Sequence, residues 1–202
     1  MNHRYALFTA ALLPALAAPA MADIVNGDFE AGNTGFSSTH QYFAVSQSPN
    51  INQYGIAHSS FEWSQFWGTI PGDHTTGHGL FMIVDVGSTN TIWQQTVAVN
   101  PGSTYSLGAW LANWTSFAST TLAIEINGQQ IATWGPPGSA AWTQYTASWN
   151  SGAATSATIR FHAASYFQPG DDIAIDDITF TPAPGAAAVF GLGAVGLMRR
   201  RR

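Results

Sequence analysis

Apolar side chains recur at every second position through most of the second half of the chain. Tyr105, Leu107 and Leu111, for example, share one face at the period of a β-strand. Turn-forming residues separate such segments, and Asn127-Gly128 is a pair that favours the tight turn of a hairpin. The pattern predicts strands at 80–86, 91–99, 105–113, 122–126, 131–134, 143–149, 155–162 and 172–180.

No long window of this region has a helical period. Residues 31–79 are less regular and rich in Ser, Gly, Asn, Gln and His, so we expect loops there with one or two short strands. Short strands at this spacing are typical of an all-β fold, a jelly-roll β-sandwich. Residues 23–181 suffice for one domain with its own core and are too few for two.

The N-terminus has the pattern of a secretory signal peptide. Arg4 precedes a mostly apolar stretch, and Ala20-Met21-Ala22 supplies the small-x-small pattern before a cleavage site. We therefore expect residues 1–22 to be removed by signal peptidase, so that the remaining chain is exported. The absence of Cys is compatible with an exported protein that forgoes disulfide bonds.

The C-terminal segment, residues 182–202, has three parts: a Pro-rich motif, the uncharged stretch 186–198, and a run of Arg. The motif and the run are formed by Pro182, Pro184, Gly185, Arg199, Arg200, Arg201 and Arg202. This end resembles the PEP-CTERM sorting signal of Gram-negative bacteria, with Ala183 in place of the usual Glu. The resemblance implies an apolar transmembrane helix in the inner membrane, then removal by an exosortase-like enzyme and release to the cell surface or extracellular matrix. The alternative is a plain tail anchor that is not processed.

Charge is distributed very unevenly along the chain. Between residues 23 and 181 there are eleven acidic residues and one basic residue, Arg160. A body so acidic is a poor partner for phosphate backbones, which argues against nucleic-acid binding.

Three motifs in order resemble the galactose-binding-like jelly rolls, in particular the family 4/9/22 carbohydrate-binding modules. They are Asn26-Gly27-Asp28-Phe29-Glu30, the segment 92–110 that contains Trp93 and Trp110, and the closing segment 173–178. The resemblance covers about residues 24–181. A second segment, 72–79, is similar to the Asp-His-Thr segment of MAM adhesion domains, which share this fold but usually carry disulfides.

The resemblance also implies a structural Ca²⁺ that ties the first strand to the last. Glu30 and Asp176 match the carboxylate positions of those modules, and Asp28 matches a position that donates a backbone carbonyl; Asp73 and Asp177 are further candidates. Ca²⁺ takes six to eight oxygen ligands, so clustered carboxylates suit it. The alternative is that these residues cap turns and lie solvated at a strand end.

His74 and His78 are four residues apart, a spacing that places two metal ligands together on a helix. Gly72, Gly77 and Gly79 make a helix improbable here. A polar loop with hydrogen-bonded imidazoles is therefore the favoured interpretation, and a Zn or Cu site is the alternative.

Aromatic side chains offer a way to bind sugars, because a Trp ring stacks on the apolar face of a sugar while amides bind its hydroxyl groups. The candidate ligand-binding residues are Trp63, Gln65, Trp67, Asn113 and Trp114. The competing interpretation for Trp63 and Trp67 is packing in the core.

The sequence contains no Gly-x-Ser-x-Gly, no His-Glu-x-x-His and no phosphate-binding Gly loop. Its remaining carboxylates, such as Glu62, Asp85 and Glu125, are not paired by any spacing. We therefore expect no enzyme activity, but an exported, surface-targeted β-sandwich that binds a glycan or exopolysaccharide. The alternative is a structural or adhesive protein that contacts other proteins or matrix.

Overall fold

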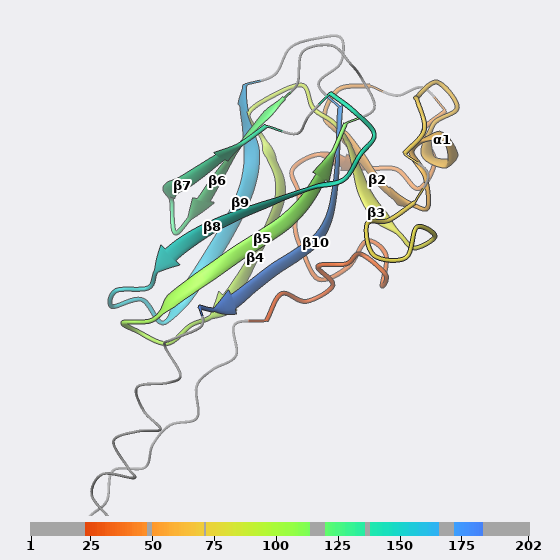
Figure 1. The fold of residues 1–202 in the computed structure, drawn as a ribbon. Helices are drawn as coiled ribbons and strands as arrows, with labels where there is room; N and C mark the ends of the chain where they lie inside the picture. The colour runs from red at the N-terminus through yellow and green to blue at the C-terminus, as the bar shows by residue number, and fades with distance from the viewer. Residues whose placement is uncertain are drawn as a thin grey trace, which may run out of the picture.

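The computed structural model describes residues 23–47, 50–70, 72–113, 120–135, 138–165 and 172–183, whose strands form two sheets (Figure 1). The elements are β1 (Gln41–Tyr42), β2 (Gln53–Ala57), α1 (Ser60–Trp63), β3 (Phe81–Asp85), β4 (Thr91–Ala98), β5 (Thr104–Ala112), β6 (Thr121–Ile126), β7 (Gln129–Trp134), β8 (Thr143–Asn150), β9 (Ser156–Ser165) and β10 (Asp172–Pro182). Every strand that the alternation predicts is present, so the prediction of an all-β fold is confirmed.

The six-stranded sheet has the order β1-β2-β3-β10-β5-β8, and the four-stranded sheet has the order β4-β9-β6-β7. Only β1 and β2 pair in parallel; the other pairs of named strands are antiparallel. The last strand, β10, lies between β3 and β5 at the centre of the larger sheet (Figure 1). Among the described strands, the one nearest the C-terminus therefore lies between two strands that precede it in the sequence.

The main core lies between the two sheets. Trp93 of β4 and Phe161 of β9 face it from the smaller sheet, and Leu107 of β5 and Phe180 of β10 face it from the larger one. Because side chains alternate between the faces of a strand, each strand contributes about every second residue. All members of this core and of the smaller core described next lie between residues 24 and 180. Every member of both cores thus falls within residues 23–181, the stretch that the sequence predicts to be one domain.

A smaller core covers the opposite face of the six-stranded sheet. There Phe81 and Ile83 of β3 pack against Trp63 and Ile70 from the segment around α1. Both faces of β3 are therefore buried, which explains why its first four residues, 81–84, are all apolar.

The predicted hairpin joins β6 to β7. Asn127 and Gly128 have φ values of 53° and 78°, the left-handed conformations that this turn requires. The predicted turn is therefore confirmed.

The predicted signal peptide, and the C-terminal segment from residue 184 onward, lie outside the described residues. Pro182 ends β10, and the backbone N–H of Ala183 donates to the Thr104 carbonyl at 2.9 Å. Across the ranges that the structure describes, we find no helix with the length and apolar character needed to cross a bilayer.

Candidate functional site

The predicted ligand contact by Trp63 is wrong. Trp63 is fully buried, its indole N–H donates to the Phe43 carbonyl at 2.8 Å, and its ring lies 4.4 Å from that of Trp67. Trp63 is therefore part of the smaller core, and its enclosed indole leaves no surface on which a sugar could stack. Trp67 is half-buried against the same core.

Of the other three predicted ligand-binding residues, the structure describes Asn113 and Gln65. Asn113 is fully buried just after β5, and its backbone N–H donates to the Ser139 carbonyl at 3.2 Å. Direct ligand contact by Asn113 is thus a second wrong prediction. Gln65 is exposed beside Phe66, and Trp114 lies outside the described residues.

The candidate metal-binding carboxylates gather around the loop of residues 72–80. Glu30 Oε1 accepts the Leu80 N–H at 2.7 Å, and Asp176 Oδ2 accepts the His74 N–H at 2.8 Å. A Cβ atom on Gly79 would lie 2.1 Å from Glu30 Oε1 and 2.9 Å from an Asp73 oxygen. Only a glycine at this position lets the two carboxylates converge.

Asp177 contacts the same loop through His74 and Thr75, and Asp28 lies near Asp177. Asp177 occupies the left-handed region, with φ of 47°, at the bulge where β10 shifts register against β5. Asp28 is exposed and lines a surface pocket together with Asp177. The structure therefore brings four of the predicted residues to one loop and places the fifth near them.

The pKa values of two of these carboxyls are shifted in opposite directions. Burial raises the pKa of Asp176 to about 8, the charges of Asp177 and Asp73 add to the rise, and the N–H groups of His74 and Asp177 oppose it. Burial also raises the pKa of Asp73, but hydrogen bonds from Thr76, Gly79 and His78 outweigh it and lower the value to about 2. A cation bound beside Asp176 would offset the free-energy cost of ionising this buried carboxyl.

The oxygens at this loop are nevertheless engaged by donors of the chain itself. Among the described residues, no three His, Cys, Asp or Glu side chains are arranged to hold a metal ion. The His74 ring stacks on Trp110 at 3.5 Å, and its Nδ1 lies 2.7 Å from Asp177 Oδ2. This geometry supports the polar-loop interpretation of His74, while Ca²⁺ stays a prediction that rests on the type of ligand.

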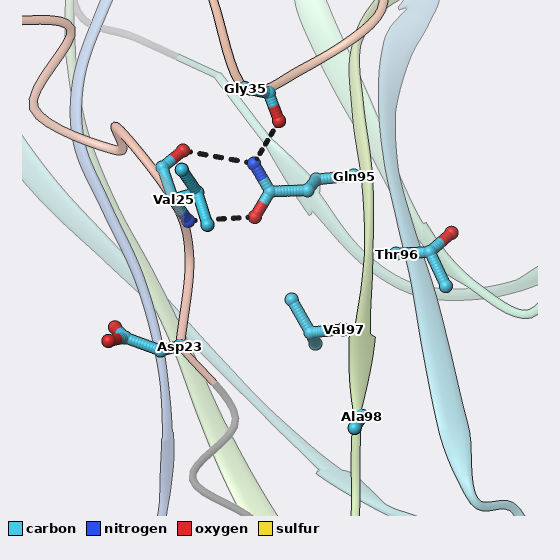
Figure 2. Close-up of a pocket in the computed structure, with 7 residues that line it drawn as sticks. All are labelled: Asp23, Val25, Gly35, Gln95, Thr96, Val97 and Ala98. Carbon is cyan, nitrogen blue, oxygen red and sulfur yellow. Dashed lines mark hydrogen bonds between the residues drawn. The ribbon is translucent and has the colours of Figure 1, made fainter. Parts of the chain in front are cut away.

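A pocket of about 300 Å³ lies between β4 and the first described residues of the chain (Figure 2). The Gln95 side chain occupies one wall: its Oε1 accepts the Val25 N–H at 2.8 Å, and its Nε2 donates to the Val25 and Gly35 carbonyls. This amide is saturated by backbone groups of residues 25–35. We therefore assign Gln95 a structural role.

A different group of polar side chains crosses the outer face of the four-stranded sheet. The register places Gln94 of β4 opposite Arg160 of β9, Arg160 opposite Glu125 of β6, and Glu125 opposite Gln130 of β7. The neighbours Ile124 and Ile159 face the main core, so these four side chains point outward. We call Gln94, Arg160, Glu125 and Gln130 the polar row.

Glu125 is the centre of the polar row. Its two oxygens lie 3.0 Å from Arg160 Nη1 and 3.0 Å from His162 Nε2. Arg160 also donates through Nε to Thr91 Oγ1 at 2.8 Å. Desolvation raises the pKa of Glu125, but the hydrogen bonds and charges of Arg160 and His162 outweigh it, and the net shift is downward. The group is thus a fixed, charge-assisted network that remains partly open to solvent.

Sequence reasoning did not pair Glu125 with Arg160, because they are far apart along the chain. Two signals were present nonetheless. Arg160 is the sole basic residue between 23 and 181. The strand period also places Glu125, Arg160 and His162 on the polar faces of their strands. What the sequence lacked was the order of the strands.

Comparisons with known proteins identify the fold. No family model matches the chain, and no curated protein matches it. Among solved structures, the CBM22-1 xylan-binding domain of Paenibacillus barcinonensis Xyn10C superposes with a TM-score of 0.52 at 11% identity, covering 82% of this chain and 97% of that one. The chain therefore shares its β-sandwich fold with carbohydrate-binding modules.

Two further structures extend this result. TmCBM61, solved with β-1,4-galactotriose, has a TM-score of 0.50 at 14% identity and covers 80% of this chain and 99% of that one. The enzymatically active domain of bacteriophage CBA120 tailspike protein 4 has a TM-score of 0.52 at 17% identity over 80% of this chain. This chain spans only 21% of that tailspike chain. The structures similar to this chain thus include separate carbohydrate-binding modules and part of a larger, enzymatically active tailspike domain.

Proposed function

We propose that this chain is an exported, non-catalytic, surface-targeted protein that binds carbohydrate with the outer face of its four-stranded sheet. The observation that carries the proposal is the polar row, in which a guanidinium, a carboxylate and two amides cross all four strands in register. Such groups bind sugar hydroxyl groups with both donors and acceptors. The xylan-binding and galactotriose-binding neighbours with this fold add support.

The rigidity of the polar row favours binding rather than catalysis. Arg160 is held by Glu125 and Thr91, so little side-chain freedom is lost when a ligand arrives. Glu125 is ionised at neutral pH because its pKa is lowered, and a carboxyl kept ionised cannot serve as a general acid. The glycan would be a neutral polymer, since Arg160 is already neutralised by Glu125.

Export rests on the two ends of the chain, which lie outside the described residues. The pattern of residues 1–22 supports processing by signal peptidase, and that of residues 182–202 supports transient anchoring in the inner membrane before removal by an exosortase-like enzyme. A surface protein in this position would meet exopolysaccharide directly. Ca²⁺ at the loop of residues 72–80 is the cofactor we propose for stability.

The test is a glycan array and a polysaccharide pull-down with residues 23–183. We expect retention on one class of neutral glycan, and loss of that retention in Arg160→Ala. The control is Trp67→Ala, a change in the smaller core on the other sheet, which should still bind. If no glycan is retained, the proposal is wrong, and the alternative function of contact with other proteins takes its place.

A further inference from the structure

In the part of the chain that the structure describes, strand β8 is an edge of the six-stranded sheet, and its own sequence lacks the features that usually protect an edge. It ends the order of the six-stranded sheet and pairs with β5 along all eight residues in one unbroken register. Natural edge strands are kept from pairing by short length, bulges, charges or proline. The sequence of β8, Thr-Gln-Tyr-Thr-Ala-Ser-Trp-Asn, has no charge and no proline.

The other described edges are protected. At β4, Ser37 exchanges two backbone hydrogen bonds of 2.9 Å with Gln94, and the Thr39 N–H donates to Thr91. The edge strand β1 has only two residues, and β7 is interrupted by a register shift. Hence β8 is the longest regular edge of the described sheets.

Charge singles out the same region. From residue 126 to residue 159 the sequence contains no Asp, Glu, Lys, Arg or His, although the domain as a whole is strongly acidic. This uncharged span includes all of β7 and β8. Two copies of an acidic domain repel each other at most surfaces, but a contact through β8 brings no like charges together.

The side chains of β8 also suit a pairing that continues the sheet. Tyr145 and Trp149 pack toward the main core, whereas Gln144, Thr146 and Ser148 are exposed on the outer face. The Tyr145 hydroxyl donates to the Gly135 carbonyl, so the beginning of β8 lies against the end of β7. The part of β8 from Thr146 onward comes after this contact with β7 in the sequence.

We propose that the partner of this edge is β8 of a second copy of the chain. The two strands would pair antiparallel around a twofold axis, which joins two six-stranded sheets into one continuous sheet. An axis perpendicular to the sheet keeps both four-stranded layers on the same side. If the polar row binds glycan as proposed above, the dimer presents two such faces in one direction and gains avidity on a polymer.

Sedimentation equilibrium of residues 23–183 tests the pairing without any glycan. Thr146→Glu places a negative charge near its symmetry mate, and we expect it to weaken the dimer at least about tenfold. Thr96→Glu is the matched control, because Thr96 is an exposed strand residue on β4 and receives the same charge. Circular dichroism establishes that both variants fold.

A chemical cross-link provides the second measurement, since the chain has no cysteine of its own. Thr146→Cys should give a covalent dimer with a short bismaleimide, whereas Ala98→Cys, exposed on β4, should not. The proposal is overturned if the wild-type protein stays monomeric at about 0.1 mM, a concentration at which even weak specific pairs associate. It is equally overturned if Thr146→Glu and Thr96→Glu weaken the dimer to the same extent. Loss of glycan binding alone would leave the dimer in place, so the two proposals fail separately.

Discussion

Arg160 and Glu125 face each other across β9 and β6, with Arg160 Nη1 3.0 Å from Glu125 Oε2. This pair carries opposite charges in the middle of a sheet face whose neighbouring positions are mostly Thr, Gln and Ser. The pair lies on the solvent side of the four-stranded sheet, because the flanking residues Ile124 and Ile159 face the main core. The proposed binding site is built around it.

Glu125→Gln should lower stability through the loss of this charged network. We expect a decrease in the free energy of unfolding of about 1 kcal/mol at pH 7, because hydrogen bonds between charged groups are replaced by weaker ones. The pKa of Glu125 is lowered in the folded state, so its contribution is present above its unfolded pKa and is lost as pH falls through the folded value. Urea denaturation from pH 7 down to about 3 should therefore show a shallower acid decline in the variant. An identical decline in both proteins would contradict the network.

Trp63→Ala should be strongly destabilising, because the indole is fully buried and its N–H is bonded to Phe43. Large-to-small changes of this kind cost about 3–5 kcal/mol. Phe66→Ala is the control: Phe66 is 66% exposed in the same segment, and its removal should change the free energy of unfolding by less than about 0.5 kcal/mol. Equal losses in the two variants would show that Trp63 is not a core residue.

Ca²⁺ should raise the melting temperature of residues 23–183 relative to chelator. A ligand that binds only the folded state adds about 2.7 kcal/mol when its concentration is a hundredfold above Kd. Glu30→Ala should abolish the shift, because the Glu30 carboxylate converges with Asp73 on Gly79. Glu62→Ala, which removes an exposed carboxylate on α1, should keep the shift. A melting temperature that ignores calcium would reject a structural site.

Asp176 should make the metal-free protein less stable as pH rises. Its pKa of about 8 in the folded state exceeds the unfolded value of about 4, so the folded protein holds a proton that the unfolded chain has lost. In chelator, stability is therefore highest below about pH 4 for this group and is lost as pH rises toward about 8. Asp176→Asn should flatten that slope in denaturant titrations; an unchanged slope would exclude Asp176 as its source.

The strands were predictable because a strand with one buried face has an apolar residue at about every second position of its sequence. Leu122, Ile124 and Ile126 alternate with Ala123 and Glu125, and the hairpin turn follows directly. Such elements are determined locally: the strands by the alternation of side chains between two faces, and the turn by the φ preference of Asn-Gly. Sequence alone therefore reached the fold class without any pairing information.

The site was less predictable because burial depends on contacts that are distant in sequence. Trp63 lies in a short polar segment and resembles an exposed binding residue, yet Gly55 of β2 has no Cβ, and this gap admits the Trp63 indole. Similarly, nothing local joins Glu125 to Arg160; strand order does. The grouping of the acidic residues was easier to predict. Glu30 lies in the first motif of the domain and Asp176 in the closing one, and β10 brings the closing segment close to the first.

The most direct test of the central claim is calorimetric titration of the best glycan from the array into wild type, Arg160→Gln and Trp67→Ala. Arg160→Gln removes the charged donors of the polar row while keeping a polar side chain, and it should weaken binding at least about tenfold, as expected when a ligand loses its charged hydrogen bonds. Trp67→Ala should bind like wild type, provided that it is folded. The opposite result, full affinity in Arg160→Gln and loss in Trp67→Ala, would contradict the account and return the site to the aromatic segment around α1.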